Sequence, residues 1–521
     1  MPSNPLLLPR AGAVSSVLCV VALLAGCAAP VNRTPAVAAK PVESQQRYAW
    51  FNRLSWGATA SQMDANAALS PDAYLAAQLH PEQATLPQPV ASQIAAMTIS
   101  QRTLVQLVQD MEQRRKDADV VADNDQKKAA QQAYQQEMNR LAREAATRHL
   151  LRGLYASSQV QEQMTWFWLN HFNVHQAKSN LRAMVGDYED TAIRPHALGR
   201  FRDLLGAVTT HPAMLRYLDN EQNAAGRINE NLAREVMELH TMGVTGGYSQ
   251  QDVQQMARVL TGVGVNLQST EPKLKPELQQ YYVHRGLFEF NPNRHDFGAK
   301  TLLGQPIQAK GLAEVDEALD RLARHPATAA FISRKLAQFW LADEPPPALV
   351  QRMAASFQAT DGDIAATLKT LFTSTEFAQG AGGKFKDPMH YVMSSVRLAY
   401  DDKPILNAGP ILNWLSRMGE PLYGHATPDG YALDQAAWAS PGQMATRFEI
   451  AKAIGSGNAG LFKTDGPSPQ ERAAFPQLSN ALYFQSIKKS LGAGTLAALD
   501  QATSPQEWNM YLLAAPEMMV R

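Results

Sequence analysis

Two glutamates and an asparagine provide the most concentrated set of chemically useful side chains in this sequence. They are Asn231, Glu235 and Glu238, within the segment 228–247, INENLAREVMELHTMGVTGG. At about 100° per residue, these three side chains fall on one narrow stripe of a predicted helix. The two carboxylates could therefore share a ligand or a proton.

The rest of that helix limits what the stripe can do alone. Asn229 is a favourable N-cap, and Gly243 follows the last predicted turn. His240 falls in the middle of the opposite, apolar arc, so this helix by itself cannot supply a Glu/Glu/His metal site. The alternative interpretation is a solvent-exposed acidic face with an Arg234–Glu238 ion pair and a core histidine bonded to a carbonyl.

Two histidines, His171 and His175, lie in the apolar segment 161–175, QEQMTWFWLNHFNVH. Apolar residues all round predict a buried helix. Residues four apart share a helix face, so both imidazoles could be ligands of one zinc ion. No glutamate follows His171 directly, so the segment is not the H-E-x-x-H motif. Packed, hydrogen-bonded histidines are the alternative.

A second tier of candidates surrounds these residues. Arg194 and His196 bracket a proline, and His295 stands beside Asp296 in a predicted loop. A histidine next to an aspartate could bind a ligand or transfer a proton, whereas the alternative is a turn with a surface salt bridge. The second tier is completed by Asn231 and His240.

The composition excludes some classes of function. The 521 residues are 45% hydrophobic, and 48 basic side chains balance 48 acidic ones. This apolar content suffices for a large core. Nucleic-acid-binding proteins usually carry a basic excess, so we expect no nucleic-acid partner. The sequence also lacks a phosphate-binding P-loop, a G-x-S-x-G elbow and a dinucleotide fingerprint.

The N-terminus predicts export. Arg10 precedes the short apolar run 11–24, which is too short for a convincing membrane span. The run ends in Leu-Ala-Gly-Cys at 24–27, which resembles the lipobox of bacterial lipoproteins and implies lipidation of Cys27. We therefore expect a signal peptide at 1–26 and a lipidated tether at 27–46; an ordinary signal peptide with an incidental cysteine is the alternative.

The cysteine count has a chemical consequence. Cys19 would leave with the signal peptide, and Cys27 would carry lipid. No thiol would then remain for a disulfide, a nucleophile or a thiolate metal site. Ala28 does not resemble the aspartate associated with inner-membrane retention. We therefore expect an anchor in the outer membrane, facing either the periplasm or the cell surface.

Helical periodicity dominates the rest of the chain. It predicts an all-α fold, a multi-helical globular array with long loops and at most a short β-hairpin, near residues 288–290. Residues 99–157 predict a long-helix hairpin whose charged stretch, 112–132, frays or loops. We place a helical domain at 47–450 and a C-terminal helical tail at 451–521.

Several motifs in a fixed order resemble the bacterial family known as domain of unknown function 1800. They include FWLNHF, IRPHALGRFRDLL, NENLAREVMELHTMGVTGG and HDFGAKTLLG, and the matches span roughly residues 51–448. The resemblance implies an exported envelope protein but no established activity. It also implies a partner, because members of the family are often neighbours of a second exported family with a phosphatase/sulfatase-like fold.

Two functions from different classes fit these observations. The first is a metal-assisted hydrolase acting on an envelope polymer or ester, with His171 and His175 as ligands of a divalent metal and Glu235 or Glu238 as general base. The second is a non-catalytic scaffold, tethered by Cys27, that binds an exported partner through the long-helix hairpin or the loop at 419–435. Both hypotheses leave the substrate open.

Overall fold

The computed structural model defines the placement of most of the chain after the predicted tether. It describes residues 44–82, 84–268, 270–380, 382–463 and 475–521. The predicted signal peptide, Cys27 and the tether as far as residue 43 lie outside the described residues. In the described part, no helix combines the length and the apolar character that crossing a membrane requires.

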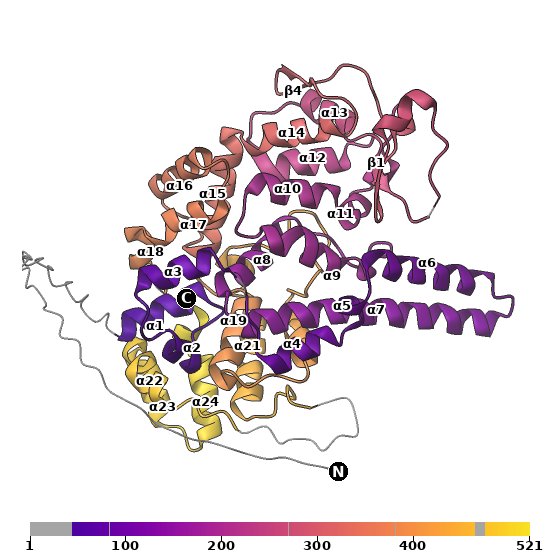
Figure 1. The fold of residues 1–521 in the computed structure, drawn as a ribbon. Helices are drawn as coiled ribbons and strands as arrows, with labels where there is room; N and C mark the ends of the chain where they lie inside the picture. The colour runs from indigo at the N-terminus through magenta and orange to yellow at the C-terminus, as the bar shows by residue number, and fades with distance from the viewer. Residues whose placement is uncertain (1–43, 83, 269, 381, 464–474) are drawn as a thin grey trace, which may run out of the picture. The chain divides into compact units, whose positions relative to one another are not determined.

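The predicted all-α class is confirmed, since helices dominate from the first described segment to the last (Figure 1). The first helices are α1 (Ser44–Leu54), α2 (Ala60–Ala65), α3 (Pro71–Leu79), α4 (Gln88–Ala95), α5 (Thr98–Gln101), α6 (Leu104–Val120), α7 (Asn124–Tyr155) and α8 (Gln159–His171). The central helices are η1 (Leu181–Ala183), α9 (Val185–Asp187), η2 (Tyr188–Ile193), η3 (Arg194–His196), α10 (Phe201–Thr210), α11 (Pro212–Tyr217), η4 (Asn220–Gln222), α12 (Asn231–Met237), η5 (Glu238–Met242) and α13 (Gln250–Val259). Of the short helices, η2 and η5 are π-helices.

The C-terminal part continues the pattern. Its longer helices are α14 (Ala313–Ala323), α15 (Pro326–Trp340), α16 (Pro347–Ala359), α17 (Ile364–Phe372), α18 (Thr375–Gln379), α19 (Pro388–Tyr400), α20 (Gly409–Arg417), α21 (Pro441–Gly455), α22 (Ala481–Gln485), α23 (Ala493–Asp500) and α24 (Pro505–Ala514). Its 3₁₀ turns are η8 (Gln435–Ala437), η9 (Ile487–Ser490) and η10 (Pro516–Met519).

Short strands occur between α13 and α14. A three-stranded antiparallel sheet has the order β1 (Val263–Val265), β3 (Phe288–Phe290), β2 (Val283–Arg285), and a two-stranded pair joins β4 (Thr301–Leu302) to β5 (Gln305–Pro306). The turns η6 (Pro276–Tyr281) and η7 (Pro292–Arg294) flank β2 and β3. The strand expected at 288–290 is therefore present, and both of its neighbours are short.

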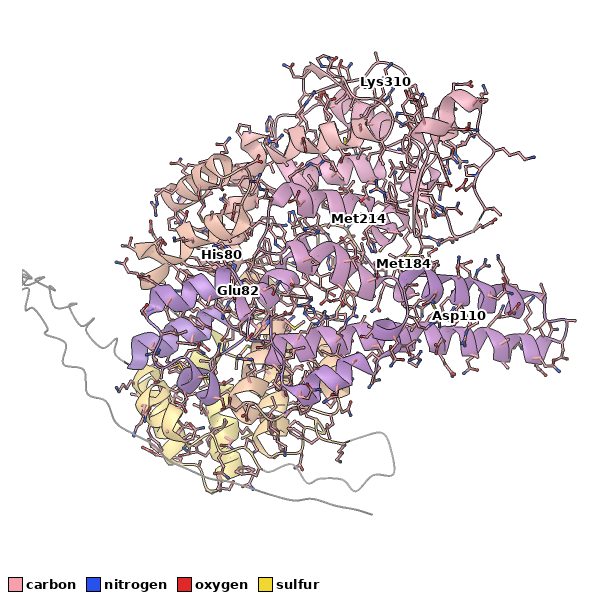
Figure 2. The ribbon with its side chains drawn as sticks, in the orientation of Figure 1. His80, Glu82, Asp110, Met184, Met214 and Lys310 are labelled. Carbon is pink, nitrogen blue, oxygen red and sulfur yellow. The ribbon has the colours of Figure 1, made fainter. Side chains whose placement is uncertain are left out.

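The predicted long-helix hairpin is formed by α6 and α7, which lie side by side (Figure 1). Thr103 caps α6 through a complete capping box, and Asp123 caps α7. The stretch 112–132, expected to fray or loop, does contain the loop between the two helices, at 121–123, but the rest of it is helical. Local ion pairs stabilise this region, including Arg115 with Glu112 and Asp119 at 3.1 Å each. Figure 2 shows Asp110 on the α6 arm.

The core lies around α8, whose aromatic side chains are buried on every side. Phe167 and Trp168 pack on each other at 4.8 Å between ring centroids, and Trp168 also packs on Phe172 and Phe201. The Trp168 indole N–H donates to the Ala197 carbonyl at 2.9 Å, so its polar atom is satisfied inside the core. The last turn of α8 is thereby held against η3 and α10.

Candidate functional site

The acidic stripe lies where α12 changes into the π-helix η5. The helix begins one residue later than predicted: Glu230, not Asn229, is its N-cap and makes no side-chain cap bond, while Asn229 Oδ1 accepts the Asn231 backbone N–H at 3.0 Å. The α-helix lasts only to Met237, because the wider turn begins at Glu238. The Thr241 hydroxyl supports this turn by donating to the Val236 carbonyl at 2.7 Å. Single π-turns within helices occur frequently at functional sites.

The expected Arg234–Glu238 ion pair is absent from the described contacts of Arg234. Its guanidinium instead bonds Glu230 at 3.0 Å and Gln250 at 2.9 Å. Arg234 thus pairs with Glu230, the carboxylate that precedes it by four residues, while Glu238 begins the π-helix. Glu235 and Glu238 are half-buried. The alternative interpretation, an exposed acidic face with Arg234 paired to Glu238, therefore does not describe this part of the helix.

A loop from the C-terminal part contributes a third carboxylate, Asp429. Its Oδ1 accepts the Thr427 hydroxyl at 2.5 Å and the His425 Nε2 at 3.3 Å. The Asn173 amide holds this loop by donating to the carbonyls of His425 at 3.0 Å and Thr427 at 2.8 Å. The Tyr217 hydroxyl adds a bond to the Ala426 carbonyl at 2.8 Å.

Gly430 allows the loop to approach α8 closely. Its φ is +74°, and a Cβ at this position would lie 2.1 Å from the Asn170 carbonyl oxygen. The Asn170 side chain bonds the next residue twice, accepting the Tyr431 N–H at 2.6 Å and donating to its carbonyl at 2.9 Å. Glycine is required here because any side chain would push the loop, and Asp429 with it, away from α8.

A lysine on α15, Lys335, completes the charged group. No hydrogen bond or ion pair joins its ammonium to another residue in the described part of the chain; Nζ lies 5.6 Å from the centroid of the Phe331 ring. Burial lowers the pKa of Lys335 to about 8, and the Asp429 carboxylate opposes this shift. An amine with this pKa exchanges its proton near neutral pH.

The carboxylates shift in the opposite direction. Burial raises the pKa of Glu235, and the charges of Glu238 and Asp429 raise it further, against the opposing effect of Arg234. Burial also raises the pKa of Tyr217 to about 12, with contributions from Asp429 and Glu235. Asp429 therefore interacts electrostatically with Glu235, Lys335 and Tyr217, although these residues come from distant parts of the sequence.

Two buried imidazoles lie next to this group. His171 Nε2 lies 3.1 Å from the His240 carbonyl oxygen, and since a carbonyl only accepts, Nε2 carries the hydrogen. The two rings are 6.2 Å apart, and both side chains are nearly inaccessible. Among the described residues, His171 Nδ1 and both ring nitrogens of His240 have no partner. Burial, followed by the charge of Lys335, lowers the pKa of His240 to about 3 and lowers that of His171 well below its usual range.

The buried neutral His240 predicts acid sensitivity. In the unfolded chain a histidine titrates near 6.5, whereas folded His240 has a pKa of about 3. The unfolded state therefore binds protons first, and this contribution to stability is lost as pH falls from about 6.5 towards 3, by up to about 1.4 kcal/mol per pH unit. We expect His240→Leu to retain about 2 kcal/mol of the stability that the wild type loses between pH 6.5 and pH 5, measured by urea unfolding. The exposed His80 is the control, and an equal effect of His80→Leu would contradict the prediction.

His175 does not share a helix face with His171. α8 ends at His171, because Phe172 leaves the helical conformation with ψ of 51° and the Asn173 side chain bonds the loop instead. The helix predicted to reach residue 175 is therefore shorter than expected. His175 lines a different cavity, beside Arg143 and Arg182. Within the described ranges, no three His, Cys, Asp or Glu side chains form a group that could hold a metal ion, and the metal site remains a prediction.

Arg194 belongs to a buried ion-pair network. It pairs with Glu162 of α8 and Glu189 of η2. Glu189 also accepts the Tyr423 hydroxyl at 2.5 Å and lies 3.1 Å from His149 Nδ1. The network joins α7, α8, η2 and the loop that carries Asp429. Arg194 therefore affects the site indirectly, by holding these elements in place. His196, also near α8, is half-buried, and burial lowers its pKa.

His295 and Asp296 form a separate cluster. His295 is buried, with Nε2 3.1 Å from Glu314 Oε1 and Nδ1 2.8 Å from the Thr261 carbonyl oxygen. Asp296 pairs with Arg258 at 2.7 Å. The salt bridge that was the alternative interpretation of this segment is therefore present, together with a core histidine. Asn231, the remaining second-tier residue, donates to the Leu218 carbonyl at 3.2 Å and fixes the start of α12.

Lys335 and Asp429 are the site residues that the sequence analysis did not single out. Lys335 directly follows Ser333 and Arg334 in α15, so the sequence gives no signal that its ammonium is buried. Asp429 lies in a Pro-Asp-Gly turn, where aspartate is common for reasons of turn geometry alone. Only the fold shows that this turn reaches the acidic stripe.

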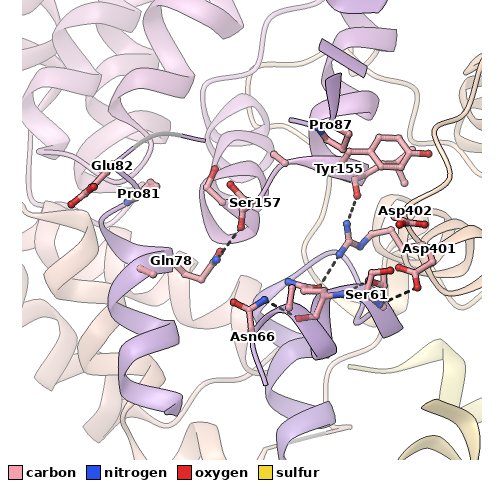
Figure 3. Close-up of a pocket in the computed structure, with 18 of the residues that line it drawn as sticks. Ser61, Asn66, Gln78, Pro81, Glu82, Pro87, Tyr155, Ser157, Asp401 and Asp402 are labelled. Atoms are coloured by element: carbon pink, nitrogen blue, oxygen red, sulfur yellow. Dashed lines mark hydrogen bonds between the residues drawn. The ribbon is translucent and has the colours of Figure 1, made fainter. Parts of the chain in front are cut away.

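A separate cavity of about 740 Å³ lies between α2, α3, the end of α7 and the end of α19 (Figure 3). The buried Arg397 donates to the carbonyls of Gly57 and Leu154 and, at 3.0 Å, to Gln62 Oε1. Asp401, with φ of +50°, accepts the Ser61 N–H at 3.0 Å. The residues that line this cavity include none of the candidate site residues.

Comparison with known proteins identifies one family. A sequence model described as protein of unknown function (DUF1800) matches residues 49–520. No curated protein and no solved structure matches the chain.

Proposed function

Since the chain belongs to the DUF1800 family of proteins of unknown function, we propose its function from the site: a cell-envelope lipoprotein that hydrolyses an envelope polymer or ester. The reacting groups are Glu235, Glu238, Asp429 and Lys335. The lipobox at 24–27 supports the location, and the site chemistry supports the reaction class.

One observation carries the proposal: a carboxyl group and an amine in the same site are shifted in opposite directions, both towards neutral pH. Burial and neighbouring carboxylates raise the pKa of Glu235, whereas burial lowers that of Lys335 to about 8. Such opposed shifts are typical of acid–base pairs in active sites, because a general base and a general acid work best near the operating pH. Charged side chains on an ordinary protein surface keep pKa values close to those of the free amino acids.

The roles follow from the charges. Glu235 acts as the general base that takes a proton from the attacking water. The Lys335 ammonium stabilises the negative charge that develops on the substrate oxygen and then donates a proton to the leaving group. Asp429 favours the protonated form of Lys335. Glu238 keeps the Glu235 pKa raised.

The test of Lys335 is a pH–rate profile on a panel of chromogenic esters and glycosides. We expect the wild-type rate to rise as Glu235 loses its proton and to fall near pH 8 as Lys335 loses its own. Lys335→Met should lower the rate about 10²-fold or more and remove the alkaline fall. Lys310→Met is the control, because Lys310, labelled in Figure 2, is an exposed lysine between β5 and α14. If the pH–rate profile of Lys335→Met is the same as that of the wild type, Lys335 is not the general acid.

The metal-assisted form of this hydrolase has its own test. Since α8 ends at His171 and His175 lines a different cavity, one ion held by both histidines requires the helix to extend to residue 175. In that case the mature protein should retain a divalent metal through purification, and His171→Ala should lose it. Elemental analysis of both proteins measures this directly. If the metal-free wild type hydrolyses its substrate in the presence of a chelator, the reaction needs no metal, and the carboxylates and Lys335 are the catalytic groups.

A partner-binding scaffold is the second candidate, and the α6–α7 hairpin favours it. Most residues between 112 and 137 are exposed, and Val120 near the tip is 80% exposed. An exported phosphatase/sulfatase-like protein is the expected partner. In this case removal of the hairpin tip, rather than any change at Glu235, would abolish function.

A further inference from the structure

We propose that a cavity of about 410 Å³ beside the base of the hairpin is a binding site for a phosphate group on a small ligand. Arg143 of α7, Arg182 of η1 and His175, just after α8, line it. This site is separate from the carboxylate and lysine group, and the inference does not depend on the proposed hydrolase.

The positive charges that line the cavity are not balanced by negatively charged side chains in its wall. No carboxylate is among the residues that line it. Arg143 has no hydrogen bond or ion pair to any residue in the described part of the chain. Arg182 donates to Asn139 Oδ1 at 2.6 Å and Gln135 Oε1 at 2.8 Å, and both acceptors are neutral amides that leave its charge unpaired.

Two nitrogen atoms of the residues that line the cavity also lack partners. Arg182 Nε and His175 Nδ1 are both buried and unbonded among the described residues. Leaving such polar atoms unsatisfied costs free energy. Because both atoms are inaccessible to water, a ligand accepts from them only after the Arg182 or His175 side chain turns towards the cavity, and His175 Nδ1 donates only when it carries the hydrogen. These two atoms and the free guanidinium of Arg143 come from three separate elements.

The number and geometry of the donors favour a phosphate over a carboxylate. A phosphoryl group presents three oxygens in different directions, whereas a carboxylate presents two in one plane, and arginine pairs well with phosphate. The remaining wall is apolar and includes Ala146, Leu412 and Leu422. Ligand sites commonly combine an apolar wall with a few polar groups at this volume. The ligand is therefore a phosphate ester with an apolar or uncharged body.

The test is calorimetric titration of the mature protein with phenyl phosphate, benzoate and dihexanoyl phosphatidic acid below its micelle concentration. We expect both phosphates to bind more tightly than benzoate. Arg143→Gln should weaken phosphate binding about tenfold or more, since a hydrogen bond to a charged group is lost. Lys128→Gln is the matched control, because it removes the same charge from an exposed position on the same helix and should change the Kd less than twofold.

The two phosphate probes distinguish the source of the ligand. Tighter binding of the phosphatidic acid indicates a lipid headgroup, and tighter binding of phenyl phosphate indicates a soluble ester. Failure of both to bind at millimolar concentration, equal binding of benzoate, or an equal effect of Lys128→Gln would overturn the proposal. Because Arg143 is exposed and unbonded, Arg143→Gln is expected to keep the wild-type circular dichroism spectrum and melting temperature.

Discussion

The turnover number of Glu235→Gln is expected to be about 10²–10⁴-fold below that of the wild type. Glutamine preserves the size and hydrogen-bonding capacity of the side chain but cannot accept the proton of the attacking water. The KM should change little, since the residue acts on the water rather than on the bulk of the substrate. The measurement is kcat and KM on the best substrate of the ester and glycoside panel.

Glu221 provides the control for this variant. It is another half-buried glutamate whose pKa is raised by burial, and it pairs with Arg216 at 3.4 Å, outside the proposed machinery. Glu221→Gln should keep kcat within a few fold of the wild type. If both variants retain full function while removal of the hairpin tip abolishes it, the protein is a scaffold and the hydrolase proposal is wrong.

The free energy of unfolding of Arg194→Met is expected to be about 3–5 kcal/mol below that of the wild type. The substitution leaves the buried carboxylates of Glu162 and Glu189 without their common partner. In the wild type burial opposes the ionised form of Glu189, but the neighbouring His149 and Arg194 outweigh it and hold its pKa well below the usual range. Urea unfolding at pH 7 measures the loss.

The comparison for Arg194 is an exposed ion pair of similar geometry. Arg200 bonds Asp361 at 2.6 Å, but its side chain is 57% exposed. Removing an exposed pair changes stability by less than about 1 kcal/mol, because water already screens both charges. Arg194→Met combined with Glu162→Gln should recover part of the loss, since one of the two stranded charges is then removed. Equal effects at Arg194 and Arg200 would mean that the network does not stabilise the fold.

Much of the fold could be predicted from sequence periodicity and capping residues. The hairpin and the strand at 288–290 depend on local patterns, and both are present. His211-Pro212 and His325-Pro326 each begin a helix, with the histidine ring accepting a backbone N–H two residues later. The second half of the central helix was not predictable in this way, because the π-turn at Glu238 depends on the buried Thr241 hydroxyl and not on amphipathic spacing.

The candidate site was only partly predictable for a related reason. Glu235 and Glu238 are three residues apart in the sequence, so their proximity was predictable, although the change from α12 to the π-helix at Glu238 was not. Asp429 comes near Glu235 on one side and Lys335 on the other only through tertiary packing, which no local pattern encodes. His175 illustrates the opposite error. Its spacing from His171 suggested a shared helix face, but the helix ends at His171, and the Asn173 side chain bonds the distant loop.

The attachment of that loop to α8 through Gly430 and Asn170 has a consequence for biogenesis. Asp429 is added to the growing polypeptide long after α8 and α12, so a nascent chain can hold both glutamates and Lys335 while lacking the third acid. Non-local contacts of this kind form late in folding. A polypeptide that ends before residue 429 therefore lacks the loop that Asn170 binds, and the carboxylate group is complete only when the C-terminal part docks on α8.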